Sequence, residues 1–307
     1  MIVDVHWHLW VAMEKHPSTR AASAKTEELG GERIAGFDIG LVPDWEKREQ
    51  DLVRWLDEDG VDVACLVLAE YGLILNDNIF SVDGENRIQA EIMRRHPDRL
   101  LSFFGIDPRR PESADMFERY LRNGDAKGLK LHPTAGFFPH DRSAYPLYEL
   151  CVEYDVPVLY HCGPMRAPFY GRFARPMEFD DVAADFPDLN IILGHAGEDL
   201  WEETVSVARM KPNMYVDFSY WQPALRFEDE WVRAVARMRD VMGVERLLFG
   251  SDHPGMTRIA NFPLGDWLNV WRDLPALGKK YGHKFTADEV DGILGDNAAR
   301  LLKLPQR

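Results

Sequence analysis

The side chains best suited to chemistry are His6 and His8, close to the start of the chain. They lie in the apolar segment Ile2–Leu9, which we expect to form a buried strand. Strand side chains alternate between faces, so Asp4, His6 and His8 should line one face. Two imidazoles that converge from one rigid strand supply half of a metal site. Two hydrogen-bonded structural histidines would give the same pattern, so the rest of the chain must decide.

The elements that would position such a site follow from short apolar runs separated by helix-length segments. Most runs are continuously apolar, as expected for parallel strands buried on both faces. The segments between them include the amphipathic patterns Trp45–Asp59 and Gly84–His96, which stop at Gly60 and before Pro97. We predict a single-domain (β/α)8 barrel, the TIM-barrel fold. Its eight strands should lie within Ile2–Leu9, Val63–Leu68, Leu100–Ile106, Gly128–His132, Pro157–Cys162, Asn190–His195, Met214–Ser219 and Arg246–Asp252.

The connections at the two ends of this predicted barrel differ in kind. Those leading into strands are short turn sequences, such as 59–62 and 96–99. Those leaving strands are long and rich in glycine, proline and aromatic residues, such as 133–145 and 163–179. Barrel enzymes place their chemistry in the loops that follow the strands, so this end is the expected functional face. We predict that the long segment 10–43 is a rim or lid over it.

Potential metal ligands gather at that face. His161 and Asp252 end the predicted fifth and eighth strands, as His6 and His8 end the first. Three imidazoles and one carboxylate suit one divalent cation, Zn²⁺ first, with Mn²⁺ or Fe²⁺ as alternatives. A bound ion would lower the pKa of a coordinated water towards about 7 and make hydroxide available at neutral pH. The alternative for Asp252 is a helix cap after the last strand.

Three further polar side chains end predicted strands without belonging to this ligand set. His195 is predicted to be catalytic, by polarising a substrate or moving a proton, and its alternative is a bond to neighbouring backbone. His132 should touch the substrate at the rim. Lys130 is unusual in a buried strand and is a candidate catalytic residue. It could contact an anionic substrate, bridge two metals as a carbamate, or pair with a carboxylate, for which the candidates are Asp4, Asp217 and Asp252.

These motifs resemble the amidohydrolase superfamily, and in particular its family 2 branch. The resemblance covers almost the whole chain and rests on His161 and on the segments Asp4–His8, Gly194–Gly197, Phe249–Asp252 and Gly295–Leu302. It implies a metal held by His6, His8, His161 and Asp252, with His195 as the catalytic histidine. Members of the branch include metal-dependent hydrolases and non-oxidative decarboxylases of aromatic or muconate-like acids. The segment Lys130–Pro133 is more similar to the hydrolases.

The predicted loop after the fifth strand gives clues to the substrate. It carries Arg166, Arg172 and Arg175 among aromatic residues in an otherwise acidic protein. Arginine recognises carboxylate or phosphate through its planar fork, so Arg166 and Arg172, with Trp10, are predicted to bind substrate. The alternative is a solvated loop in which these arginines form ion pairs with acidic side chains at the surface. An aromatic or carboxylated small molecule would also suit the aromatic residues expected at this face, which are Trp7, Trp10, Tyr71, Phe137, Phe138, Tyr220 and Trp221.

The leading functional hypothesis is a metal-dependent hydrolase of a small carboxylated or aromatic molecule. It would cleave an ester, amide, lactone or activated carbon–carbon bond, with Asp252 taking the proton and His195 steadying the oxyanion. The alternative is a metal-dependent decarboxylase, in which Asp252 protonates carbon and carbon dioxide leaves. A non-catalytic metal-binding barrel ranks third.

Composition bounds the possible partners and location. The 307-residue chain is 46% hydrophobic and has a net charge of −15, which argues against binding to nucleic acid or to anionic membranes. We expect no signal peptide, since the first residues are predicted to form a strand, and no membrane-spanning run, and the sequence contains no glycine-rich nucleotide loop. The three cysteines lack zinc or redox spacing and fit a reducing cytoplasm. A homo-oligomer is compatible with Trp231, Trp267 and Trp271, which are either surface or core residues.

Overall fold

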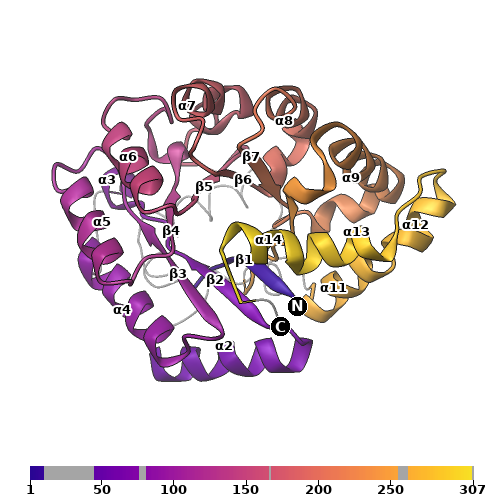
Figure 1. Cartoon of the computed structure of the whole chain (residues 1–307), viewed down its shortest axis with the longest axis horizontal. Coiled ribbons are helices and arrows are strands. Elements are labelled where there is room, and N and C mark those ends of the chain that lie inside the picture. The colour runs from indigo at the N-terminus through magenta and orange to yellow at the C-terminus, as the bar shows by residue number, and fades with distance from the viewer. Residues whose placement is uncertain (10–44, 76–80, 166, 255–261, 306–307) are drawn as a thin grey trace.

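Eight parallel strands form the centre of the protein, with helices around them (Figure 1). The computed structural model describes residues 1–9, 45–75, 81–165, 167–254 and 262–305. The strands follow one another in sequence order around the ring, and each lies within the run that predicted it. They are β1 (Val3–Trp7), β2 (Val63–Val67), β3 (Leu100–Gly105), β4 (Gly128–Leu131), β5 (Val158–His161), β6 (Ile191–Gly194), β7 (Met214–Asp217) and β8 (Leu247–Leu248). The predicted TIM-barrel fold is thereby confirmed.

The helices on the outside confirm the alternating pattern. They are α2 (Trp45–Asp59), α3 (Gly72–Leu75), α4 (Val82–Arg95), α5 (Ser113–Arg122), α6 (Tyr145–Glu153), α7 (Asp180–Asp185), α8 (Trp201–Ala208), α9 (Glu228–Met242), α11 (Leu264–Arg272), α12 (Leu274–Lys280), α13 (Ala287–Asp291) and α14 (Asn297–Leu301). Helix α2 has the predicted bounds, whereas α4 begins two residues before the predicted start. The reason is a cap, because the Ser81 hydroxyl oxygen accepts the N–H of Gly84 at 3.0 Å.

The ring closes between β8 and β1 through a few backbone hydrogen bonds. Val5 donates to the carbonyl of Phe249 at 3.0 Å, and Asp252 donates to the carbonyl of His6 at 3.0 Å. His8 then donates to the carbonyl of His253 at 2.9 Å. These bonds run from the middle of β1 to its carboxyl end, so they bring Asp252 beside the two histidines of β1.

An irregularity in β1 corrects the predicted alternation of its side chains. The ladder with β2 pairs Asp4 with Ala64 and Trp7 with Leu66, so β1 has one residue more than its partner there. In a regular strand Asp4 and His6 would lie on the same face. Because of the extra residue they do not. Its carboxylate instead accepts bonds from the Ser251 backbone and hydroxyl and from the backbone N–H of His6.

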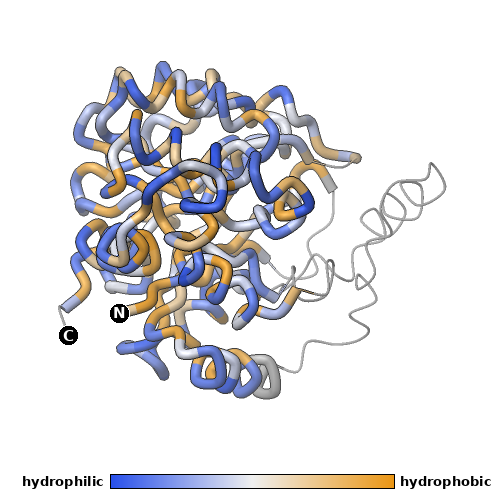
Figure 2. Tube along the Cα trace, turned by 90° about the vertical axis from the view of Figure 1, so that its right-hand side faces the viewer, coloured by the Kyte–Doolittle hydropathy of each residue, from blue (hydrophilic) through white to orange (hydrophobic). Residues whose placement is uncertain are grey.

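Two apolar cores hold the strands in place. The larger one lies between the strands and the surrounding helices and includes Trp7, Trp231, Trp267 and Trp271. These tryptophans are therefore core residues, and Trp7 does not line the barrel mouth as predicted. The smaller core joins side chains from six of the strands to Ala298 and Leu301 of α14. Figure 2 shows hydrophobic residues concentrated on the inner elements. In the same view, both termini lie at one side of the molecule.

Helix α14 covers the barrel end at which the strands begin. It packs against β1 and β8, and Figure 1 shows it near the middle of the ring. The chain approaches closely there, since a Cβ on Gly295 would meet the carbonyl oxygen of Met1. Within the described residues, no helix is both long and apolar enough to cross a bilayer. The segment 10–43, with Trp10, lies outside the described residues, as does Arg166.

Candidate metal centre

Three predicted ligands meet at the carboxyl ends of β1 and β8. The Oδ1 of Asp252 lies 3.2 Å from the Nε2 of His8 and 3.7 Å from the Nε2 of His6. Their potential ligand atoms all lie within 4.8 Å of one another, and all three residues are buried. Two imidazole nitrogens and a carboxylate oxygen at this spacing form the donor set of an open divalent metal site.

Hydrogen bonds at the far side of each ring show that this donor set fits a cation. His8 Nδ1 lies 2.9 Å from the carbonyl oxygen of Val67, which can only accept, so this nitrogen carries a proton. His6 Nδ1 lies 3.0 Å from a carboxylate oxygen of Asp217 and is protonated for the same reason. In the neutral rings the Nε2 lone pair of His8 therefore faces the carboxylate of Asp252, and that of His6 lies between Asp252 and the ammonium of Lys130. Electron-rich atoms at that distance need a proton or a cation between them.

The protonation states favour metal binding as well. Burial and the charge of Lys130 lower the pKa of His6 to about 3, so its imidazole is neutral at neutral pH. Burial alone would raise the pKa of Asp252, but the interactions of its carboxylate with the neighbouring rings of His8, His195 and His6 outweigh burial and lower that pKa. A neutral imidazole and an ionised carboxylate are the forms that bind metals.

His161, the fourth predicted ligand, is placed beside these three rather than among them. Of the clusters of possible ligands formed by the described residues, one joins His6, His8 and Asp252 and the other joins His6, His195 and Asp217. His161 belongs to neither, because its Nδ1 is hydrogen-bonded to the Nε2 of His195 at 3.0 Å. Its role as a metal ligand stays a prediction.

Lys130 lies on the other side of His6. Its ammonium donates to the Nε2 of His6 at 3.2 Å, so the hydrogen bond goes to an imidazole and not to a carboxylate. Burial lowers the pKa of Lys130 from 10.5 to about 8, and the charges of Asp217 and Asp252 partly offset that effect. Lys130 thus places a positive charge directly beside the candidate metal centre.

His132 and two aromatic residues form a wall next to His161. The rings of His132 and His161 are stacked with their centroids 4.2 Å apart. Tyr71 lies edge-on to His132 at 4.7 Å and contacts Phe169 at 4.8 Å. The hydroxyl of Thr134 bonds the Nδ1 of His132 at 2.7 Å and fixes the ring. The three rings are inclined to one another, by 74° between Tyr71 and His132, so the wall offers ring edges and faces to a small molecule.

The described arginines of the loop after β5 differ in their surroundings. Arg175 forms an ion pair with Glu203 at 2.9 Å, so the surface-pairing alternative holds for this residue. Arg172 is exposed, and its guanidinium stacks on the rings of Tyr170 and Phe173 at 4.8 and 4.5 Å. Its binding to substrate stays a prediction. Phe137 is buried in the larger core, under the guanidinium of Arg109.

The sequence analysis missed two features of the site. One is the contact of Asp217 with imidazole rings, and the other is Ser219. Asp217 was considered only as a partner for Lys130, yet it bonds the predicted ligand His6. The Ser219 hydroxyl lies 3.0 Å from the Nδ1 of His6 and 2.9 Å from the Nδ1 of His195. A carboxylate at the end of β7 was the available signal, because it matches the position of Asp252 after β8.

The chain is similar to several known proteins. The chain matches the family model Amidohydro_2, described as amidohydrolase, over residues 3–304. It is similar to the 2-keto-4-carboxy-3-hexenedioate hydratase of a Sphingobium species, with 25% identity over 302 residues and 84% of each chain covered. Among solved structures, an uncharacterised TIM-barrel protein of Bordetella bronchiseptica is similar with a TM-score of 0.71, 20% identity, and 99% and 98% of the two chains covered.

A third similar protein is the 5-carboxyvanillate decarboxylase of Novosphingobium aromaticivorans, whose structure contains manganese. Its TM-score is 0.65 at 16% identity, with 99% of this chain and 96% of that chain covered. At such identities the structural matches support the fold alone. The family model, in contrast, spans nearly the whole sequence and includes every predicted ligand. The chain therefore belongs to the amidohydrolase family.

Proposed function

We propose that the protein is a metal-dependent enzyme that directs water onto a small carboxylated molecule. The reaction would be hydrolysis of an ester, amide, lactone or activated carbon–carbon bond, or hydration of an activated double bond. The observation that carries the proposal is the convergence of His6, His8 and Asp252 on one point, with His195 close by. The similarity to a hydratase of an unsaturated carboxylic acid supports the addition of water.

Nitrogen and oxygen donors of this kind suit Zn²⁺, Mn²⁺ or Fe²⁺, with Zn²⁺ as the first choice. His6, His8 and Asp252 would hold the ion, and His161 would join them as a fourth ligand. When bound, a divalent ion supplies an acidified water and polarises a substrate oxygen.

The residues around the ion would divide the remaining work. Burial lowers the pKa of His195, so its neutral ring can accept a proton and return it. Asp252, held ionised, would assist the same proton transfer. Lys130 provides the positive charge that attracts a substrate carboxylate. The wall formed by Tyr71, His132 and Phe169 would pack against the planar part of the substrate.

A second candidate is non-oxidative decarboxylation of an aromatic or muconate-like acid. The aromatic wall beside His161 would pack against a benzoate ring, and the similar Novosphingobium protein is a decarboxylase. In this reaction Asp252 would protonate the carbon that loses carbon dioxide. The two candidates share the ligands and differ in their products.

The test is a substrate panel on protein reconstituted separately with Zn²⁺ and Mn²⁺. We expect turnover of carboxylated esters, lactones or enedioates, with water incorporated into the product and no carbon dioxide released. Release of carbon dioxide from hydroxybenzoates would establish the second candidate instead. Turnover of neither set by metal-loaded protein would contradict both. Within the panel, Arg172→Ala should raise KM for carboxylated substrates, whereas the matched variant Arg175→Ala should not, because Arg175 is paired with Glu203.

A further inference from the structure

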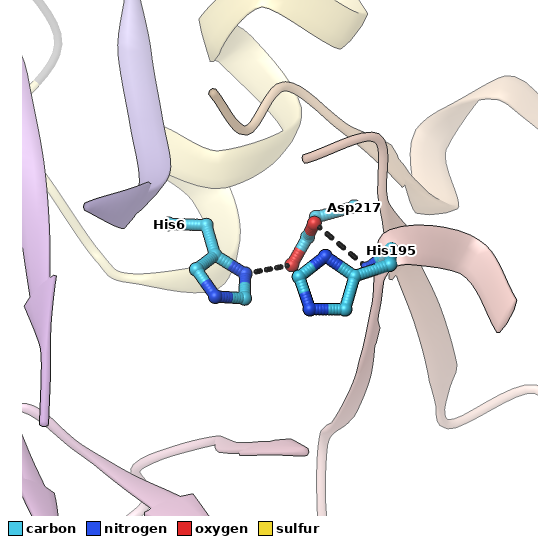
Figure 3. A group of neighbouring side chains, drawn as sticks. All are labelled: His6, His195 and Asp217. Atoms are coloured by element: carbon cyan, nitrogen blue, oxygen red, sulfur yellow. Dashed lines mark hydrogen bonds and ion pairs between the residues drawn. The ribbon is translucent and has the colours of Figure 1, made fainter. Parts of the chain in front are cut away.

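Asp217 is a buried carboxylate whose oxygens are surrounded by donors from three strand ends. Its Oδ2 lies 3.0 Å from the Nδ1 of His6, and its Oδ1 accepts the backbone N–H of His195 at 3.1 Å (Figure 3). The same Oδ1 accepts the backbone N–H of Ser219 at 2.9 Å and a short bond from the Ser219 hydroxyl. This carboxylate therefore links a predicted metal ligand from β1 to the predicted catalytic histidine after β6.

The Ser219 hydroxyl extends the link to the ring of His195. A hydroxyl has one proton, and that of Ser219 is donated to Asp217. Its oxygen can then only accept from the two imidazole nitrogens beside it, which are Nδ1 of His6 at 3.0 Å and Nδ1 of His195 at 2.9 Å. The backbone carbonyl of Ser219, at 3.2 Å from the same nitrogen of His195, also only accepts. Both Nδ1 atoms must therefore carry a proton.

We propose that Asp217 and Ser219 act as one positioning unit that holds His6 and His195 in the same tautomer. With Nδ1 protonated in both rings, both Nε2 atoms are acceptors. The Nε2 of His6 accepts from the ammonium of Lys130 at 3.2 Å, and the Nε2 of His195 accepts the Nδ1–H of His161 at 3.0 Å. The ring centroids of the two histidines lie 4.8 Å apart, so one carboxylate can set both. The role of this arrangement in catalysis rests on the proposed function. The tautomers themselves rest only on the hydrogen bonds around the two rings.

A purely structural role would be different in a measurable way. The backbone bonds from His195 and Ser219 to Asp217 would be enough to join the ends of β6 and β7. In that case the tautomers of both rings would stay unchanged when the Asp217 carboxylate or the Ser219 hydroxyl is removed. The fixed tautomers are thus the property that separates the two explanations, and they can be observed without substrate or metal.

The test uses metal-free protein labelled with ¹⁵N in its histidines, in which long-range spectra show which ring nitrogen is protonated. We expect His6 and His195 to have protonated Nδ1 and bare Nε2. Asp217→Asn places an amide donor opposite His6, so the proton should move to Nε2, as an aspartate-to-asparagine change does in serine-protease triads. The affinity for Zn²⁺, measured by chelator competition, should fall about 10- to 100-fold.

Two other variants complete the experiment. Ser219→Ala should leave His6 in its wild-type tautomer, because Asp217 remains. His195 keeps only the longer 3.2 Å contact of its Nδ1 with the backbone carbonyl of residue 219, so a fraction of the molecules should carry the proton on Nε2 instead. Asp185→Asn is the matched control, since Asp185 is an aspartate that accepts a bond from the Tyr145 hydroxyl at the surface. It should change neither the tautomers nor the affinity for Zn²⁺.

The proposal is overturned if either ring of the wild-type protein is protonated at Nε2. It is also overturned if folded Asp217→Asn retains both the tautomers and the metal affinity. The wild-type spectrum and Ser219→Ala still distinguish the two explanations if Asp217→Asn does not fold. Because no turnover is measured, a failure of the proposed reaction would leave these results unaffected.

Discussion

Glu85 on α4 gives a prediction that follows mainly from its burial. Its side chain is 4% exposed, and its Oε1 has no hydrogen-bond partner among the described residues. Burial and the nearby carboxylate of Glu70 raise the pKa of Glu85 from 4.5 to about 8, although Arg110 opposes them. The folded protein therefore binds one proton more than the unfolded chain between those pH values. Stability must fall as the pH rises through that window.

The size of the effect follows from the same two pKa values. Each pH unit within the window removes about 1.4 kcal/mol from the free energy of unfolding, and the whole window removes no more than about 5 kcal/mol. Glu85→Gln keeps the shape of the protonated side chain and does not titrate. The variant should match the wild type near pH 5 and exceed it by a few kcal/mol at about pH 8.

Urea unfolding followed by tryptophan fluorescence measures this difference. The control is Glu91→Gln, a change of the same type at an exposed position of α4, which should leave the pH dependence unaltered. An equal stability difference between Glu85→Gln and the wild type at both pH values would refute the reasoning. In that case Glu85 would be ionised in the folded protein, with its charge balanced by Arg110.

Three further predictions concern the site. Removal of metal by a chelator should abolish turnover and lower Tm, and added Zn²⁺ or Mn²⁺ should restore both; an unchanged Tm would count against binding in the folded state. His195→Ala should lower kcat about 10²- to 10⁴-fold and keep a stoichiometric metal, so loss of the metal, measured by elemental analysis, would contradict a role in proton transfer alone. Gly194→Ala should weaken metal binding in chelator competition, because the new Cβ would lie 2.5 Å from the carbonyl oxygen of Tyr160 and 3.2 Å from the Cε1 of His6. Unchanged affinity in that variant would show that β6 can move away without cost.

The strand pattern was predictable because burial on both faces leaves a continuous apolar run for each strand. The convergence of His6, His8 and Asp252 was predictable as well, since strand ends in a barrel share one face. The face of Asp4 was not predictable, because the irregularity in β1 changes the alternation without any mark in the sequence. The partners of Asp217 were missed for a related reason. They depend on which side chains of β1 and β6 turn towards β7, and no single strand contains that information.

The backbone conformation at His195 and Asp252, the two residues proposed to transfer protons, was not predictable from the sequence either, and it explains how their side chains are oriented. His195, Ala196, Gly197 and Glu198 all have positive φ, at 60°, 46°, 82° and 51°. Of these only the glycine adopts such angles freely, and each of the others costs on the order of 1–3 kcal/mol.

The folded structure offsets that cost with bonds to this turn. Asp217 accepts the N–H of His195, and the indole of Trp221 donates to the carbonyl of His195 at 2.5 Å. Asp252 has a φ of 57° and is fixed by its own N–H, which donates to the carbonyl of His6. A relaxed chain would direct both side chains elsewhere. Their strained backbone is therefore better explained by the geometry that the site requires than by the stability of the barrel.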